Sequence, residues 1–379
     1  MQSLKDDDSF PVARTGHIAC AVNGNMLIWG GFGQADNGFG EKYVPCESLW
    51  VYNLELQEWT RHEVPGLNMI GRSGSGCFSH RGKMYVWGGF PNHTKEVYCL
   101  DTAGISWQTI ESEGEVPEYR DKFVSWQYHE RLIVFGGFGP QPVDATKDSW
   151  VLDPSSIVEG LPQSRGWNND LFEYNIETNR WRKPKTKGPV PCPRASHAGA
   201  IIGQRGFIFG GRFKEKRRSD MHCIDLITFT WSGRLTIQGP MPEGRSWHSL
   251  TTVGPHHLLL CGGFNTTCKP LDDMWLFDTK QLLWRRLEWD LPTPRLWHTA
   301  VAGLHLGEVV IFGGCTNNIL DRHEDTVYTN SLLHISVTAK PLLRICYEMI
   351  WQHVDRFRQE IENLPPCLKR RALKMTSPR

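Results

Sequence analysis

The 379-residue sequence predicts an all-β protein, a six-bladed β-propeller followed by an α-helical C-terminal tail. Three observations predict the propeller. A Gly-Gly pair closes an apolar run six times, and an arginine stands 16 to 18 residues before each pair. In five copies, a tryptophan follows an apolar residue by seven positions. A unit of about four short strands, repeated roughly every 50 residues, is typical of a propeller blade.

The three markers keep a common register along the chain. The first glycines of the pairs are Gly30, Gly88, Gly136, Gly210, Gly262 and Gly313. The marker arginines are Arg14, Arg72, Arg120, Arg194, Arg245 and Arg295. The tryptophans are Trp59, Trp107, Trp181, Trp231 and Trp284. We interpret the arginines and tryptophans as structural, and we expect a strand near residues 9–14 to complete the last blade.

One rim of the propeller should collect the residues that follow the markers. In an antiparallel meander, the start of the first strand and the end of the second strand lie at the same edge. The long connection over residues 139–170 leaves this rim and could cover it as a lid. The residues we expect at the rim are Phe32, Phe138, Lys122, Ser246, Trp247 and Trp297, with Trp167 on the lid.

The fourth copy has a cation where the other copies have an apolar residue after the glycines. Arg212 occupies this position, and Arg217 follows five residues later. Cations gathered among aromatic side chains are costly unless an anion neutralises them. We therefore expect Arg212, Arg217 and the Ser246 hydroxyl to bind a carboxylate through charge-assisted hydrogen bonds. The alternative is a solvated basic loop in which Arg212 pairs with a neighbouring aspartate.

The pattern changes after Ile335 from a period of two to a helical period. The apolar stripe of this tail consists of Leu342, Cys346, Ile350, Val354, Phe357, Ile361 and Leu364. We therefore divide the chain into a propeller over residues 1–338 and a helical tail over residues 339–379. A helix with such a stripe must bury it, either against the flank of the propeller or in the groove of a partner.

Composition excludes several classes of function. The net charge of +1 gives no general attraction to nucleic acid, and neither a signal peptide nor an apolar span indicates a membrane. Eleven cysteines without a CxxC pair indicate reduced thiols in the cytosol or nucleus, and no zinc site. The histidines three residues after four of the marker arginines recur from blade to blade, so we interpret them as scaffold rather than as ligands of a catalytic copper ion. We expect no metal, no cofactor and no enzymatic activity.

The paired glycines, the Tyr-type residue and the tryptophan seven residues later resemble the kelch repeat over residues 14–337. The whole chain resembles the kelch-domain-containing protein 1/2 family, which are substrate receptors of cullin-2 RING ubiquitin ligases that read C-terminal degrons ending in glycine. The resemblance implies that Arg212, Arg217 and Ser246 hold the terminal carboxylate. It also implies a peptide groove formed by Lys122, Trp167 and Trp247. Phe32 and Phe138 stand where a relative carries tyrosine, so the preference for residues before the terminal glycine can differ.

The tail carries a second resemblance. "PLLRICYEMI" is similar to an elongin-binding BC box, with Leu342, Cys346 and Ile350 at its apolar positions, and "LPPCLKRRA" is similar to a cullin-2 box. The cullin-2 box positions are Leu364, Pro365 and Leu368. This resemblance implies elongin B/C, cullin-2 and its RING subunit as partners, and an adaptor that works in the cytoplasm and nucleus. The alternative is a kelch scaffold for cytoskeletal or transcription-factor partners, without ubiquitin chemistry.

Overall fold

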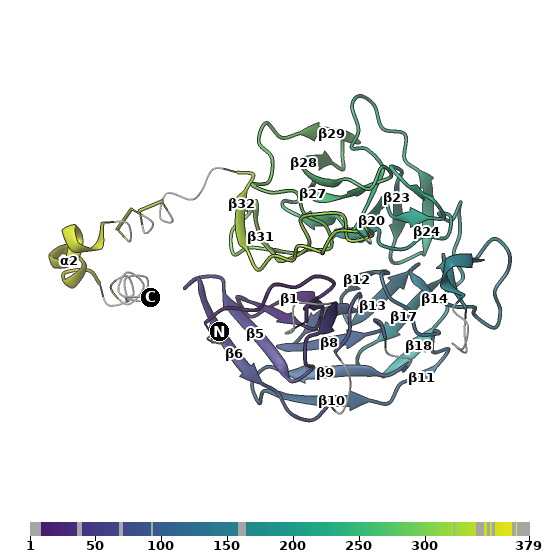
Figure 1. Ribbon diagram of the computed structural model, residues 1–379, viewed down its shortest axis with the longest axis horizontal. Coiled ribbons are helices and arrows are strands. Elements are labelled where there is room, and N and C mark those ends of the chain that lie inside the picture. The colour runs from purple at the N-terminus through teal and green to yellow at the C-terminus, as the bar shows by residue number, and fades with distance from the viewer. Residues whose placement is uncertain are drawn as a thin grey trace.

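The computed structural model describes residues 9–35, 40–67, 71–91, 94–157, 164–321 and 323–338, and in the tail residues 345–346, 349–350, 353–365 and 369. Within these residues, six antiparallel sheets stand around a common axis (Figure 1). The first strands of neighbouring sheets contact each other in one closed circle. The sheets are therefore blades around a central axis, as the repeat predicts.

Each of the first three blades contains four antiparallel strands. The first blade consists of β1 (Ile18–Val22), β2 (Asn25–Trp29), β5 (Ser48–Asn53) and β6 (Glu58–Glu63). The second blade consists of β7 (Gly76–His80), β8 (Lys83–Trp87), β9 (Val97–Asp101) and β10 (Ser106–Ile110). The third blade consists of β12 (Val124–Tyr128), β13 (Arg131–Phe135), β17 (Leu171–Asn175) and β18 (Arg180–Arg182), with β11 (Glu113–Gly114) parallel to β18.

The last three blades follow the same plan. The fourth consists of β19 (Ala198–Ile202), β20 (Arg205–Phe209), β23 (Met221–Asp225) and β24 (Thr230–Arg234). The fifth consists of β26 (Ser249–Thr252), β27 (His257–Asn265), β28 (Pro270–Asp278) and β29 (Leu283–Arg286). The described part of the sixth consists of β30 (Thr299–Ala302), β31 (Glu308–Phe312) and β32 (Leu332–Ser336).

Short strands extend the blades at one rim. In the first blade they are β3 (Phe32–Gln34) and β4 (Glu41–Tyr43), and in the fourth they are β21 (Arg212–Phe213) and β22 (Lys216–Arg217). In the fifth blade, β25 (Arg245–Ser246) pairs with the end of β27. The lid expected over residues 139–170 forms a small sheet of β14 (Phe138–Pro140), β15 (Trp150–Leu152) and β16 (Arg165–Asn168), with the 3-10 turn η1 (Pro154–Ser156).

A ring of backbone hydrogen bonds closes the propeller at this rim. In each blade, the residue two after the marker arginine donates its N–H to the carbonyl of its counterpart in a neighbouring blade, over 2.7 to 3.3 Å. All six of these residues have a positive φ, which turns the N–H toward the neighbour. The ring members are Gly16, Gly74, Lys122, Ser196, Trp247 and Trp297.

The six marker arginines are structural, as the sequence predicts. Each is at most 1% exposed, and its Nη1 donates to the carbonyl of the first glycine of its own blade over 2.9 to 3.4 Å. The arginine's own carbonyl accepts from the second glycine of an adjoining blade. The side chain therefore fixes one blade, and the main chain joins it to the next. At Gly210 (φ +70°) a Cβ would lie only 2.5 Å from the Arg245 carbonyl oxygen, so glycine is required there.

The tryptophans seven residues after their apolar partners lie directly opposite them across the third and fourth strands of five blades. Trp181, Trp231 and Trp284 are among the largest fully buried side chains. Trp181 packs on Tyr174 of its own blade with ring centroids 5.0 Å apart, and at the same distance on Trp87 of the preceding blade. Trp231 packs on Phe135 of the preceding blade with centroids 4.7 Å apart. The spacing of seven thus places each tryptophan opposite its apolar partner, and the rings of Trp181, Trp231 and Trp284 also pack against the preceding blade.

One expectation about the last blade differs from the structure. Residues 9–14 form no strand, and among the described residues the sixth blade has only β30, β31 and β32, so the expected N-terminal completion is wrong. Closure instead comes from contacts of β1 with β30 and from the hydrogen bond between Tyr52 and His334, 2.9 Å long. In the described part of the tail, α2 (Val354–Glu362) is the only helix with defined bounds.

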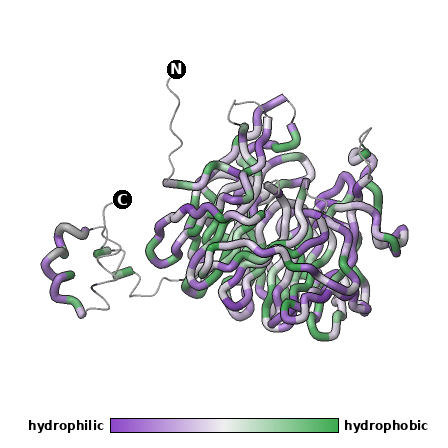
Figure 2. The backbone as a smooth tube through the Cα atoms, turned by 90° about the horizontal axis from the view of Figure 1, so that it is seen from below, coloured by the Kyte–Doolittle hydropathy of each residue, from purple (hydrophilic) through white to green (hydrophobic). Residues whose placement is uncertain are grey.

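Helix α2 is set apart from the sheets in two perpendicular views, and Figure 2 shows it as a mostly hydrophilic segment. Cys346 and Ile350 also have helical backbone; the Cys346 side chain is exposed and that of Ile350 is half-buried. No helix among the described residues has the length and apolar character needed to cross a membrane.

Candidate functional site: an aromatic pocket at the rim

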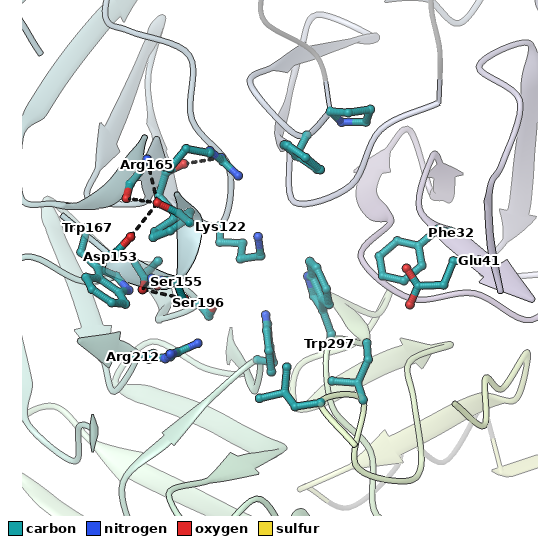
Figure 3. A pocket seen from close by; sticks show the side chains of 18 of the residues that line it. Phe32, Glu41, Lys122, Asp153, Ser155, Arg165, Trp167, Ser196, Arg212 and Trp297 are labelled. Carbon is teal, nitrogen blue, oxygen red and sulfur yellow. Dashed lines mark hydrogen bonds between the residues drawn. The ribbon is translucent and has the colours of Figure 1, made fainter. Parts of the chain in front are cut away.

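A pocket of about 660 Å³ opens at the rim that carries the short strands. Its wall combines aromatic side chains with a few charged ones, and Figure 3 shows residues of the fourth and first blades on opposite sides of it. The lining residues are Phe32, Glu41, Phe90, Pro91, Tyr119, Lys122, Phe138, Asp153, Ser155, Ser156, Arg165, Trp167, Ala195, Ser196, Arg212, Trp247, Trp297, Ile319 and Leu320.

The repeat itself builds this rim. In every blade, the residue after the marker arginine pairs in antiparallel fashion with the residue after the two glycines. The pairs are Thr15–Phe32, Ser73–Phe90, Asp121–Phe138, Ala195–Arg212, Ser246–Phe264 and Leu296–Cys315. The predicted meeting of these two sets of residues at one edge is therefore confirmed.

Arg212 lies in the wall of the pocket. Its side chain is half-buried, its Nε donates to the Lys214 carbonyl over 2.9 Å, and its guanidinium lies 5.6 Å from the centre of the Trp167 ring. Those contacts leave the terminal nitrogens directed toward the pocket side shown in Figure 3. Within the described residues, no ion pair joins Arg212 to a carboxylate, so the expected alternative of an aspartate partner is not observed.

Arg217 and Ser246 lie behind Arg212 and do not form part of the pocket wall. Arg212 and Arg217 are directly paired across β21 and β22, so both side chains extend from the same face of this hairpin. Arg217 is 9% exposed, and its Nε donates to the Ser246 hydroxyl over 3.0 Å. Its guanidinium also lies 4.5 Å from the centre of the buried Phe264 ring. Burial lowers the pKa of Arg217, and the nearby Arg212 lowers it further. An anion placed between the two guanidiniums would relieve this repulsion.

The tip of this hairpin is solvated. Lys214, Glu215 and Lys216 are exposed, whereas the two arginines at its ends are not. The tip of the hairpin is therefore a solvated basic loop, as the alternative to an anion site predicts, but Arg212 and Arg217 are not part of this loop.

Lys122 occupies the pocket floor as a member of the hydrogen-bonded ring. Its ammonium pairs with Asp121 and lies 5.3 Å from the centre of the Trp297 ring. Asp121 is fully buried and also accepts from Arg165 Nη2 over 2.6 Å. Burial alone would raise the pKa of Asp121, but Lys122 and Arg165 together hold it below its ordinary value. Lys122 is thus a neutralised cation, unlike the two arginines of the fourth blade.

The lid is attached to the rim through Arg165. Its guanidinium lies 4.8 Å from the ring centres of both Phe90 and Phe138, and it donates to the Phe138 carbonyl over 2.8 Å. On the same strand β16, Trp167 is 3% exposed and packs edge-on against Phe138 at 5.6 Å. The lid therefore supplies one wall of the pocket, beside Arg212.

An aromatic wall faces the lid. Trp247 and Trp297 stack with ring centroids 5.2 Å apart and planes 19° apart, and Phe32 packs edge-on against Trp297 at 5.5 Å. The indole Nε1 of Trp247 is buried and has no hydrogen-bond acceptor in the described structure. A bound ligand with a carbonyl oxygen would provide that acceptor.

Seven of the predicted site residues line the pocket, namely Phe32, Lys122, Phe138, Trp167, Arg212, Trp247 and Trp297. Sequence reasoning missed Arg165 and Glu41. Both stand in connections outside the repeat, so no register identifies them. The only sequence signal for Arg165 is its position two residues before Trp167, which puts the two on one face of a strand.

The recurring histidines are scaffold, as predicted. His17 and His298 are buried and bond the hydroxyls of Thr299 and Ser249 over 2.8 and 3.0 Å. Burial, reinforced by the marker arginine beside each ring, lowers the pKa of His197 and His298 to about 3. No group of three or more His, Cys, Asp or Glu side chains could hold a metal ion within the described residues.

The predicted partner-binding residues of the tail are only partly described. Leu342 and Leu368 lie outside the described residues. Leu364, just beyond α2, is half-buried, and Pro365 is exposed. Ile361 of the predicted stripe is buried, at 2% exposure.

Comparison with known proteins agrees with this architecture. A family model described as "KLHDC2/KLHL20/DRC7 Kelch-repeats domain" matches residues 16–166 and 157–314. Kelch domain-containing protein 2 from Bos taurus is 37% identical over 373 residues, 96% of this chain and 89% of the relative. Kelch domain-containing protein 1 from Homo sapiens is 36% identical over 384 residues, 98% of this chain and 92% of the relative. The chain therefore belongs to the kelch-repeat family of Kelch domain-containing proteins 1 and 2.

Proposed function

We propose that the chain is a substrate receptor of a cullin-2 RING ubiquitin ligase, and that its rim pocket binds the C-terminal carboxylate of a glycine-ending peptide. The chain is an adaptor in this proposal, and the ligase machinery transfers the ubiquitin. The observation that carries the proposal is that Arg212 and Arg217, which lie opposite each other on β21 and β22, have no carboxylate partner among the described residues.

The chemistry of the pocket supports a peptide terminus rather than a free inorganic anion. Arg212 in the pocket wall, with Arg217 and the Ser246 hydroxyl directly behind it, forms a set of donors that matches the four lone-pair sites of one carboxylate. The stacked Trp247 and Trp297 and the edge of Trp167 provide apolar contact area for the residues before that terminus. The Trp247 indole N–H can donate to a peptide carbonyl. The preference for a terminal glycine rests on the family resemblance.

The tail supplies the second half of the proposal. Its resemblance to a BC box assigns elongin binding to Leu342, Cys346 and Ile350, and the following cullin-2 box assigns cullin contact to Leu364, Pro365 and Leu368. The exposed Cys346 and the separation of α2 from the sheets leave this segment available to partners. The ten free cysteines among the described residues suit the cytoplasm and nucleus, where we place the protein.

Reconstitution tests this function. The full chain should capture purified elongin B/C, and with cullin-2, its RING subunit and the ubiquitin cascade it should ubiquitylate a reporter that ends in glycine. Leu342→Asp with Cys346→Asp should abolish capture and ubiquitylation while peptide binding is retained. Capture that survives these substitutions would contradict the assignment of the tail. A chain that binds the peptide but never elongin B/C would be a kelch scaffold instead.

A further inference from the structure

The pocket has a negative side as well as a positive one. Glu41, on β4 of the first blade, lines the pocket, and the first blade stands opposite the fourth in a ring of six. Figure 3 shows Glu41 beside Phe32, across the pocket from Arg212. A ligand whose carboxylate is bound at Arg212 would therefore extend toward a carboxylate of the protein.

The Glu41 carboxylate is exposed and lies in an aromatic corner. Tyr328 Oη donates to Glu41 Oε1 over 3.1 Å, and burial raises the pKa of Tyr328, so the phenol stays a donor. Phe32 packs edge-on against Tyr328 at 6.1 Å and contacts Tyr43 at 5.6 Å. A carboxylate held next to aromatic faces is the arrangement that recognises ammonium and guanidinium groups.

Glu41 has capacity for such a partner. No ion pair joins it to a cation within the described residues, and on β4 the neighbouring Lys42 extends from the opposite face of the strand. The second carboxylate of the pocket wall, Asp153, is already used. Its Oδ1 accepts from the N–H and hydroxyl of Ser155 over 3.0 and 2.7 Å, where it caps η1.

We infer that Glu41, with Phe32 and Tyr328, forms a subsite for a lysine or arginine side chain upstream of the peptide's C-terminus. This inference rests on the proposed function, because the carboxylate bound at the fourth blade sets the direction of the peptide. The preferred ligand is therefore a peptide with one basic residue several positions before a terminal glycine. An extended peptide covers about 3.3 Å per residue, so one position should fit best.

A peptide scan tests the subsite. Fluorescent peptides with a free terminal glycine would carry lysine, norleucine or glutamate at each of the second to seventh positions from the end. The full chain should prefer lysine over norleucine about 3- to 10-fold at one position, and the preference should shrink in high salt. Glu41→Gln should remove this preference without weakening the norleucine peptide, and Glu41→Lys should turn it toward glutamate.

Glu58→Gln is the matched control, because Glu58 is exposed on β6 of the same blade, away from the pocket. It should leave the preference unchanged. A lysine preference that persists in Glu41→Gln, or no lysine preference at any position, would overturn the subsite. If every peptide with a free carboxylate binds no better than its amide, the proposed function fails as well. If only the lysine preference is missing, the function stands without the subsite.

Discussion

Arg212 is the charged member of a repeated position at which three counterparts, Phe32, Phe90 and Phe138, also line the pocket. Phe264 and Cys315, at equivalent positions, are fully buried, and charge there would lack a partner. Arg212 instead lies half-buried against Trp167, with the buried Arg217 behind it. In the proposed function, this one residue of the repeat binds the ligand instead of packing within a blade.

Arg212→Ala should weaken binding of a glycine-ending peptide with a free carboxylate by about 10-fold to 100-fold, because one or two charge-assisted hydrogen bonds are lost. Isothermal titration of the purified full chain measures this loss. Arg205→Ala is the control, since Arg205 is exposed at the opposite end of β20, and it should bind normally. A loss below twofold in Arg212→Ala would show that this guanidinium does not contact the ligand.

At the scale of single residues, the sequence predicts the side chains whose positions the repeat fixes. Lys122, Trp247 and Trp297 are identified because they stand at a fixed distance from a marker arginine. Glu41 and Arg165 are missed because they stand in connections of irregular length, where only the three-dimensional path shows which way a side chain extends. The sequence also does not predict the hydrogen bond between Arg217 and Ser246, because it leads us to expect both side chains to face the ligand directly.

The lid is the element that completes the pocket. The sheet of β14, β15 and β16 brings Trp167 beside Arg212, and Arg165 holds this sheet on the rim between two phenylalanine rings. Arg165 also shares the buried Asp121 with Lys122. The position of the lid therefore depends on the Arg165 guanidinium, which extends from the lid of the third blade to Phe90 of the second blade.

Arg165→Ala should loosen the lid and weaken peptide binding by about tenfold, because it removes two hydrogen bonds and leaves Asp121 with one partner fewer. Hydrogen exchange of the amides in β15 and β16 should become faster, while exchange in β19 and β20 stays slow. Arg180→Ala removes an exposed ion pair with Glu113 in the same blade and should change neither quantity. Unchanged exchange in Arg165→Ala would mean that the lid is held by other contacts.

The blades show how far element prediction reaches. Four strands per blade follow from alternating apolar runs between glycines, and five blades have them. The last blade breaks the rule because its marker tryptophan is absent, and residues 9–14 carry two bulky residues, Phe10 and Val12, that remain exposed instead of pairing. A sequence pattern shows that a strand is missing but cannot show whether another segment replaces it.

The whole molecule is a closed ring held by buried polar groups. Six main-chain hydrogen bonds run around the rim, and six arginines with their glycine carbonyls repeat beneath them. Histidines from four blades lie in the same layer, and burial lowers the pKa of all four, to about 3 for His197 and His298. Closure therefore depends on keeping these imidazoles neutral.

The ring should lose stability in mild acid. The folded state holds the four histidines neutral, whereas the unfolded chain takes up protons near pH 6.5. Their contribution is complete above pH 6.5 and is lost as the pH falls from there toward 3. Each histidine reduces the free energy of unfolding by up to about 1.4 kcal/mol per pH unit in this range. Urea unfolding at pH 7, 6 and 5 measures the slope, and a flat profile would contradict it.

The central claim is that the rim pocket recognises a carboxylate at the end of a peptide chain. Titration of the full chain with one glycine-ending peptide, as the free acid and as the C-terminal amide, tests this most directly. The acid should bind at least about tenfold more tightly, because the amide cannot accept charge-assisted hydrogen bonds from both guanidiniums. Equal affinity of acid and amide would show that Arg212 and Arg217 serve something other than a peptide terminus.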